Sequence, residues 1–178
     1  MTTDYQIFGP FELPQTSSHN RLDDKKIKKD FWDQVELEVD GLPNACGCYI
    51  FAVRAGKGAL PWYVGKASRQ SFKQECLQSH KLVKYNEILN KRRGTPLLFL
   101  ISKVTPTGKF SSKSNSKNGY PDIDFLERLF IGMSLNRNKE LLNLKDTKLY
   151  SQITVPGILN SKSNSTKSSK ELKAVLGI

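Results

Sequence analysis

The sequence of 178 residues predicts a small mixed α/β domain of the α+β type, built as a hairpin, a helix, a third strand and a second helix. Two short runs, at 47–54 and 61–66, are rich in β-branched and aromatic residues and flank a glycine-containing connection, which is typical of a β-hairpin with a longer loop. An apolar run at 97–104 predicts a buried third strand. Residues 122–136 carry the apolar spacing of a helix. One domain is the default for this length, and the chain can bury a core.

Residues 1–44 are expected to form an N-terminal extension that packs on this core. The runs at 8–10 and 13–14 contain proline and predict irregular or short extended structure, while charged residues are dense at 23–29. A DNA-contacting arm is the alternative, which the acidic residues that offset its lysines disfavour. Four apolar side chains are expected to contact the core: Phe31, Trp32, Val35 and Leu37.

The stretch between the second and third strands, residues 71–90, carries a helical pattern. It is expected to form either one helix or two segments that meet near Ser79-His80. Residues 105–120 then form a loop whose basic, low-complexity middle is expected to be mobile. Contact with a nucleic-acid backbone and a plain solvated insertion both remain open for this loop. The polar stripe of the helical stretch consists of Lys73, His80, Lys84, Glu87 and Lys91.

Residues 122–136 give the clearest helical pattern in the chain. Apolar residues recur there at helical spacing and define one wide face. Glu127 falls at the border of that face, close to Phe130, rather than on the opposite side. The apolar face consists of Phe125, Leu126, Leu129, Phe130 and Met133.

Residues 146–178 are expected to form a C-terminal extension. Within it, residues 149–155 are expected to be extended, and a Ser/Asn/Lys-rich stretch follows. The pattern Ser168-x-x-Glu171 is a capping box that opens a short helix ending near Leu176.

A positive charge of +11, with a sequence pI near 9.6, favours a polyanionic partner, of which nucleic acid is the commonest. The alternative is a basic surface that serves solubility. Eight Lys or Arg against two Glu give residues 66–93 a local charge of +6, directly after the second hairpin strand. No apolar run approaches the roughly 18 residues of a membrane span, and no signal-peptide pattern opens the chain. Three cysteines do not suggest a disulfide framework, so a cytoplasmic location without a membrane partner is expected.

Two tripeptides on the hairpin carry a family resemblance. Gly47-Cys48-Tyr49 and Tyr63-Val64-Gly65 resemble the two-part signature of the GIY-YIG nucleases, with Cys and Val where the signature has Ile. That family includes homing endonucleases, some restriction enzymes and the incision subunit of bacterial excision repair. The resemblance covers about residues 45–145 and implies a three-stranded antiparallel sheet with helices packed around it. It also implies a divalent-metal-dependent endonuclease that acts on DNA with Mg²⁺ or Mn²⁺.

The resemblance places three side chains at the reaction centre. Tyr49 would help to deprotonate the attacking water, for which a phenol needs a metal or nearby cations because it is a poor base at neutral pH. Tyr63 would hold water or phosphate, and the alternative for both is an ordinary strand tyrosine with a surface hydroxyl. Glu127 would bind the metal; alternatively, Asp124 and Glu127 form a capping-box pair at the helix start.

The family also has an arginine on the helix after the second triplet, with a histidine one turn later. Lys73 stands eight residues past Gly65 and His80 fifteen past it, so both are expected in the site. Lys66 or Lys73 would supply the catalytic cation, as a point charge where arginine offers a bidentate fork. A second alignment, anchored on the phenylalanine before Lys73, puts Glu75 at the arginine position.

Further residues complete the expected site. Asn143, sixteen residues after Glu127, resembles the asparagine that closes the family's site, with Asn138 as the fallback, and either could instead end a helix. No helix-turn-helix or zinc-finger pattern is present to read bases, so DNA contacts are expected to be mostly to phosphates. Six cations are expected to bind nucleic acid: Arg69, Lys81, Lys84, Lys91, Arg92 and Arg93.

Two rivals to a DNA endonuclease remain open on the sequence alone. The first is a nucleic-acid-binding module of the same fold that has lost catalysis, because no arginine stands at the expected position. The second is a nuclease directed at RNA. The sequence leaves target specificity, biological role and oligomeric state open.

Overall fold

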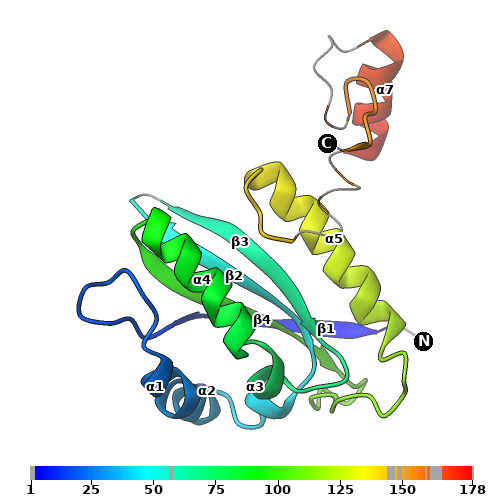
Figure 1. Cartoon of the computed structure of the whole chain (residues 1–178). Coiled ribbons are helices and arrows are strands. Elements are labelled where there is room, and N and C mark those ends of the chain that lie inside the picture. Colours follow the sequence, from blue (N-terminus) through cyan, green and yellow to red (C-terminus); the bar gives the residue numbers. More distant parts are fainter. Residues whose placement is uncertain are drawn as a thin grey trace. The chain divides into compact units, whose positions relative to one another are not determined.

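The computed structural model of the chain describes residues 3–56, 58–143, 147, 150, 152–158, 160 and 166–177 (Figure 1). The chain divides into two compact units, Met1–Leu142 and Asn143–Ile178, and each is described by itself. The first unit is an α+β domain in which helices flank an antiparallel sheet. Within the described part of the chain, no helix combines the length and the apolar character needed to cross a membrane.

In the described residues the sheet has four strands in the order β1-β4-β2-β3, and every neighbouring pair is antiparallel. β2 and β3 form the predicted hairpin, and β4 is the predicted third strand. The order leaves β1 and β3 at the edges (Figure 1). The expectation of three strands is therefore wrong. The strands are β1 (Asp4–Glu12), β2 (Gly47–Ala55), β3 (Gly58–Ala67) and β4 (Thr95–Val104).

Proline concealed the extra strand, β1, in the sequence. β1 pairs with β4, and the register shifts between Phe8 and Phe11, where Pro10 lies. An edge strand tolerates proline at such an irregularity because its free side needs no ladder hydrogen bond. Residues 4–12 therefore belong to the sheet, so residues 8–10 are extended, which is one of the two predicted alternatives.

The hairpin is tighter than predicted. β2 ends at Ala55 and β3 begins at Gly58, so the strands run well into the stretch expected to be a long loop. Pro61 lies inside β3 opposite Ala52, next to a register shift. β3 is the second edge strand, and the same tolerance for proline applies to it.

Short helices follow β1 and cover one face of the sheet. They are α1 (Asp24–Lys26), the π-helical turn η1 (Ile27–Phe31), α2 (Trp32–Glu38) and the 3₁₀ turn η2 (Leu42–Asn44). Phe31, Trp32 and Val35 are buried in the main core, as expected. Leu37 is 88% exposed, so its predicted core contact is wrong. Two positions along a helix turn a side chain to the opposite side from Val35.

The stretch after β3 forms two helical segments, α3 (Phe72–Glu75) and α4 (Ser79–Lys91), which is one of the two predicted arrangements. Ser71 and Gln74 cap α3 reciprocally, and α4 lies across the sheet (Figure 1). Tyr85 of α4 stacks on Phe51 of β2 with ring centroids 4.0 Å apart. This contact belongs to the main core, between the sheet and α1–α4.

The long helix α5 (Pro121–Arg137) packs against β3 and, through Ile123, closes a smaller apolar cluster with Cys48 and Ile101. Its predicted apolar face is wrong, because three of the five residues are largely exposed: Phe125 (70%), Leu129 (47%) and Met133 (59%). Apolar residues surround this helix, so their spacing did not select the buried side. The helix begins at Pro121, which also excludes a capping-box pair at Asp124 and Glu127.

The second unit contains α7 (Lys167–Leu176). Its cap is Thr166, whose hydroxyl accepts a hydrogen bond from the Ser169 amide at 3.2 Å, so the predicted cap at Ser168 is wrong. In the segment expected to be extended, Tyr150 and Gln152 are helical, while residues 149 and 151 lie outside the described residues.

Candidate active site

A cleft of about 840 Å³ opens beside the free edge of β3 in the first unit. Residues of α3 and α4 line it from one face of the sheet, residues of α5 line it from the other, and residues 117–119 add to its wall. Because β3 is an edge strand, side chains from both faces of the sheet reach the same cleft around it. The lining includes Tyr63, Lys66, Arg69, Glu75, His80, Lys81, Asp124 and Glu127.

The loop expected to be mobile contributes to this wall and is tied to the turn after β3. The Ser114 amide donates to the Ser68 carbonyl at 2.8 Å, and the Tyr120 amide donates to the Ser68 hydroxyl at 2.8 Å. Gly119 lies close by at a φ of +70°, where a Cβ would meet the Ser68 hydroxyl at 2.5 Å. These contacts place Lys117 and Asn118 at the cleft.

The glycines of the two triplets allow close packing inside the sheet. Gly65 pairs with Tyr49, and a Cβ on Gly65 would lie 2.3 Å from Cζ of the Tyr49 ring. Gly47 has a φ of +154°, and a Cβ there would lie 2.0 Å from the carbonyl oxygen of Ile101. The glycine at 65 is therefore covered by a tyrosine rather than left open beside it.

The two signature tyrosines share one face of the hairpin, with ring centroids 6.2 Å apart, but only one of them lines the cleft. Tyr63 lines it, and burial, followed by the charge of Glu127, raises the pKa of Tyr63 to about 12. Tyr49 is fully buried, and this burial raises its pKa well above the usual value. Tyr49 therefore does not line the cleft, and its expected help in deprotonating the attacking water stays a prediction.

Lys81 connects Tyr49 to the cleft. Its ammonium donates to the Tyr49 hydroxyl and to the carboxylate of Glu75, and the side chain is only 4% exposed. An ammonium has three N–H donors, so these two bonds leave one donor for a ligand in the cleft. Lys81 was expected among the surface cations, and the structure instead buries it at the base of the candidate site.

The sequence did not reveal this position because the polar stripe was counted straight through residues 73–91, across the point where two segments were allowed to meet. The chain leaves the helix after Glu75 and re-enters it at Ser79, which rotates the following side chains. A signal was present in the alignment that put Glu75 at the arginine position. A partly buried carboxylate favours a cation beside it, and the nearest lysine after the break is Lys81.

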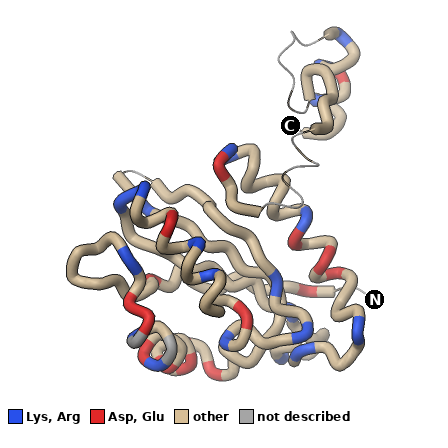
Figure 2. Tube along the Cα trace, in the orientation of Figure 1, with Lys and Arg blue, Asp and Glu red and all other residues tan. Residues whose placement is uncertain are grey.

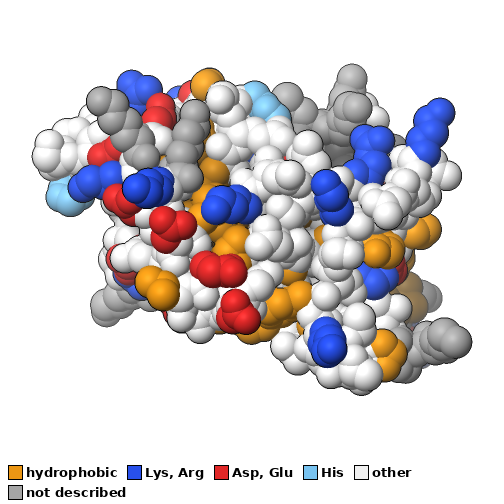
Figure 3. Space-filling view, turned by 90° about the horizontal axis from the view of Figure 1, so that it is seen from below, with side chains coloured by type: hydrophobic (Ala, Val, Ile, Leu, Met, Phe, Trp, Pro, Cys, Tyr) orange, Lys and Arg blue, Asp and Glu red, His pale blue; other side chains and the backbone are white. Residues whose placement is uncertain are grey.

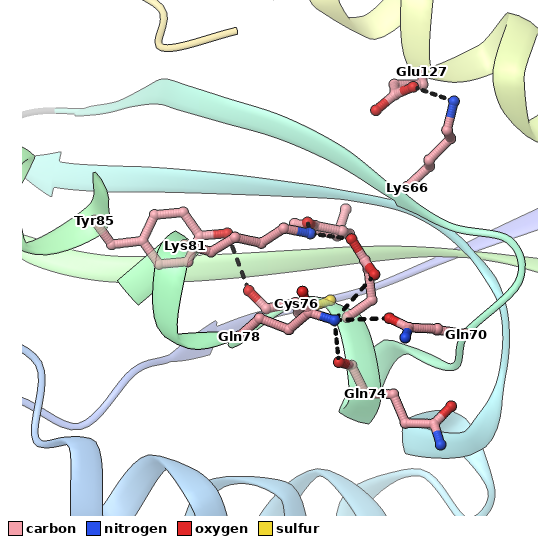
Figure 4. Close-up of polar contacts among 10 residues, drawn as sticks. Lys66, Gln70, Gln74, Cys76, Gln78, Lys81, Tyr85 and Glu127 are labelled. Carbon is pink, nitrogen blue, oxygen red and sulfur yellow. Dashed lines mark hydrogen bonds and ion pairs between the residues drawn. The ribbon is translucent and has the colours of Figure 1, made fainter. Parts of the chain in front are cut away.

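Lys66 and Glu127 meet on the other side of β3. The Lys66 ammonium lies 2.9 Å from Oε2 of Glu127 and 3.0 Å from Oδ1 of Asp124 (Figure 4). Burial alone would lower the pKa of Lys66, but the hydrogen bonds to Glu127 and Asp124 outweigh it and raise that pKa. The Glu127 side chain is 17% exposed, so its carboxylate is partly shielded from solvent.

Other predicted site residues lie at the rim of the cleft or away from it. His80 and Arg69 are exposed and line the rim, whereas Lys73 is exposed on α3 outside the lining. Asn143 belongs to the second unit, so it is not part of the site described here. Asn138 donates to the Pro61 carbonyl at 2.8 Å, which gives it a structural role.

The remaining predicted nucleic-acid contacts follow α4 away from the cleft. The Lys84 ammonium lies 5.4 Å from the ring centroid of Tyr63, and Lys91, Arg92 and Arg93 are exposed at the far end of the helix. Arg92 pairs with Glu140 at 3.3 Å. Figure 2 shows positive positions recurring along α4, whose one acidic residue is Glu87. On the face seen from below, Figure 3 shows acidic and basic side chains together in the left half, whereas the charged side chains of the right half are mostly basic.

The fit of a divalent metal can be tested on the carboxylates of α5. Among the described residues, no group of three or more His, Cys, Asp or Glu is arranged to hold a metal. Asp124 and Glu127 do converge, however, with one oxygen each about one cation, the Lys66 ammonium. Two carboxylates suit Mg²⁺ or Mn²⁺, because Mg²⁺ in particular completes its shell with water and phosphate oxygens.

Comparisons with models of protein families, with curated proteins and with solved structures gave no match to this chain. The resemblance to the GIY-YIG nucleases therefore rests on the two triplets and on the position of Glu127. Any function must be argued from the chemistry of the cleft.

Proposed function

We propose that this protein is a divalent-metal-dependent endonuclease of the GIY-YIG type, which hydrolyses DNA phosphodiester bonds in the cleft beside β3. One observation carries the proposal. Tyr63, Lys81 and Glu127 come from β3, α4 and α5, and all three line one cleft. A phenol, a buried ammonium and a carboxylate are the groups that such a hydrolysis uses to orient water, to balance phosphate charge and to hold a metal.

Lys81 is the cation best placed to meet a phosphate oxygen. Its two internal partners, Glu75 and Tyr49, hold the ammonium in a fixed position, so little reorganisation is needed when charge develops in the transition state. Tyr49 then acts through Lys81 as a positioning residue. A lysine in this place supplies the cation for which the family uses an arginine.

Tyr63 serves as a hydrogen-bond donor in this scheme. A phenol whose pKa is about 12 stays protonated at neutral pH, so it can donate to a phosphate oxygen or hold the attacking water. Mg²⁺ or Mn²⁺ bound at Glu127 would supply Lewis-acid stabilisation and a more acidic water. The cations along α4 would contact the DNA backbone on either side of the scissile bond.

A metal-dependent cleavage assay tests the proposal. We expect the wild type to nick supercoiled plasmid in Mg²⁺ or Mn²⁺, and Glu127→Gln to lower the rate by about 100-fold or more, because a metal ligand is lost. Glu87→Gln is the matched control, since it neutralises an exposed glutamate of α4 outside the cleft. Equal rates for Glu127→Gln and the wild type would refute the assignment. Duplex, single-stranded and RNA substrates run in parallel separate a DNA nuclease from an RNA nuclease.

A binding module without catalysis is the second candidate, and one observation favours it. The Lys66 ammonium already pairs with both Glu127 and Asp124, so the two carboxylates have a cation between them without any metal. A wild type that binds DNA but leaves plasmid uncut in both metals would establish this alternative.

A further inference from the structure

In the cleft, Lys66 of β3 contacts two carboxylates of α5 at once. Its ammonium lies 3.0 Å from Asp124 and 2.9 Å from Glu127, with one oxygen from each carboxylate turned towards it. Figure 4 shows the lysine extending from β3 to meet Glu127 on α5. The ammonium therefore stands at the point where the two carboxylates converge.

The two carboxylates need a cation between them. Asp124 and Glu127 are three residues apart on one helix, so their side chains share a face, and like charges at this spacing repel each other. Lysine supplies a compact charge on a flexible stem, and 39% of this side chain is exposed, which leaves it a path towards solvent. A divalent ion binds the same kind of oxygen at roughly 2.0–2.1 Å, closer than an ammonium can approach. The two cations cannot occupy the point of convergence together.

We propose that the Lys66 ammonium is a resident cation that a divalent metal displaces, with Asp124 joining Glu127 as the second carboxylate ligand. The displaced ammonium stays in the cleft because its stem is fixed on β3. There it becomes available to a phosphate oxygen, a last step that rests on the proposed function.

This exchange couples metal binding to nucleic-acid binding. In the free protein, the metal competes with Lys66 for the carboxylates, which weakens the apparent metal affinity. A bound phosphate removes the ammonium from that competition, so nucleic acid raises the metal affinity, and by linkage the metal raises the nucleic-acid affinity equally. The cleft would then load its metal mainly when substrate is present.

Mn²⁺ binding, measured by electron paramagnetic resonance of the free ion, tests the exchange without any need for turnover. Lys66→Met should tighten Mn²⁺ binding by about 5- to 150-fold, the range of ordinary coupling between sites. A short DNA duplex should tighten Mn²⁺ binding to the wild type and should do so less in the variant, where only the phosphate oxygens that bind the metal itself still contribute. Asp124→Asn should weaken binding in both backgrounds. Lys66→Gln, which retains hydrogen-bond donors beside the carboxylates, provides a second variant if Lys66→Met is poorly folded.

Lys29→Met is the matched control, because it removes the same charge from an exposed position of η1 outside the cleft, without a carboxylate contact in the described residues, and its Mn²⁺ affinity should follow the wild type. Unchanged Mn²⁺ affinity in both Lys66 variants would overturn the exchange, as would absence of Mn²⁺ binding in every protein. If Lys66→Met tightens Mn²⁺ binding while no protein cuts DNA, the exchange stands and the nuclease proposal fails. If the wild type cuts DNA and the Lys66 variants keep its Mn²⁺ affinity, the nuclease proposal stands and the exchange fails.

Discussion

Replacing Lys81 with methionine tests the polar contact at the base of the cleft. The ammonium donates to the fully buried Tyr49 hydroxyl and to Glu75, and the Lys81 side chain is 4% exposed. Methionine keeps the length of the side chain but removes both bonds. The Tyr49 hydroxyl then loses a partner at a position with little access to water.

The size of the effect follows from these contacts. A buried hydrogen bond to a charged group contributes about 1.5–3 kcal/mol. Glu75 is 23% exposed, so water replaces part of its lost bond, and we expect Lys81→Met to lower the free energy of unfolding by about 2–3 kcal/mol. For a unit of this size, the Tm should fall by roughly 5–10 °C. Tyr49→Phe leaves the ammonium its bond to Glu75 and should cost about 1 kcal/mol.

The double variant Tyr49→Phe, Lys81→Met separates packing from polarity. The double variant removes the Tyr49 hydroxyl together with the ammonium that donates to it. Its loss in free energy of unfolding should therefore be smaller than the sum of the two single losses by about 1–2 kcal/mol. Urea unfolding followed by circular dichroism measures all three variants, with Lys84→Met as a control expected within about 0.5 kcal/mol of the wild type. If the loss in the double variant equals the sum of the losses in the two single variants, the contact between Lys81 and Tyr49 is refuted. In the cleavage assay, Lys81→Met and the double variant should both lose about 100-fold or more, whatever their relative stability.

Two further predictions concern the signature residues of β3. Gly65→Ala places a Cβ 2.3 Å from the Tyr49 ring and should lower the free energy of unfolding in urea by about 1–3 kcal/mol. The control Gly58→Ala, whose Cβ would have nothing within 4 Å, should stay within about 1 kcal/mol of the wild type. Equal losses in the two variants would contradict the close packing of Gly65 on Tyr49. The raised pKa of Tyr63 predicts a loss of stability at high pH. The pKa of this phenol is near 10 in the unfolded chain and about 12 in the folded protein, so the unfolded chain loses the proton first as the pH rises. The free energy of unfolding should therefore be unaffected by Tyr63 below pH 10 and should fall between pH 10 and 12. Tyr63→Phe should flatten that part of a stability curve measured from pH 8 to 12, and an unchanged slope would count against the shift.

Much of the first unit was predictable because its elements have strong local patterns. The hairpin strands and the strand at 95–104 are short runs rich in apolar residues, and the helix at 121–137 is a longer apolar-rich stretch without a glycine or proline over residues 122–131. β1 was missed because proline interrupts its pattern, and an edge strand accepts an interruption that a central strand would not. The buried face of α5 was predicted wrongly because apolar side chains on several sides of a helix do not identify the covered one.

The candidate site was predictable in its residue types but not in their contacts. The triplets marked Tyr49 and Tyr63, and the resemblance marked Glu127, but nothing in the local pattern indicated that Tyr49 is sealed from the cleft. Lys81 was placed on the surface because its position depends on the break between α3 and α4. A spacing rule holds only while one helix continues.

The sequence by itself determined that a hairpin forms and that a basic stretch follows it. These features depend on neighbours a few residues apart, and the period of a strand or helix is enough to reveal them. Only the tertiary structure decided that Lys66 contacts Glu127 and that Lys81 lies beneath Tyr49 rather than in solvent. Such contacts depend on which helix covers which side of an edge strand, and packing decides that among parts of the chain that no local pattern connects.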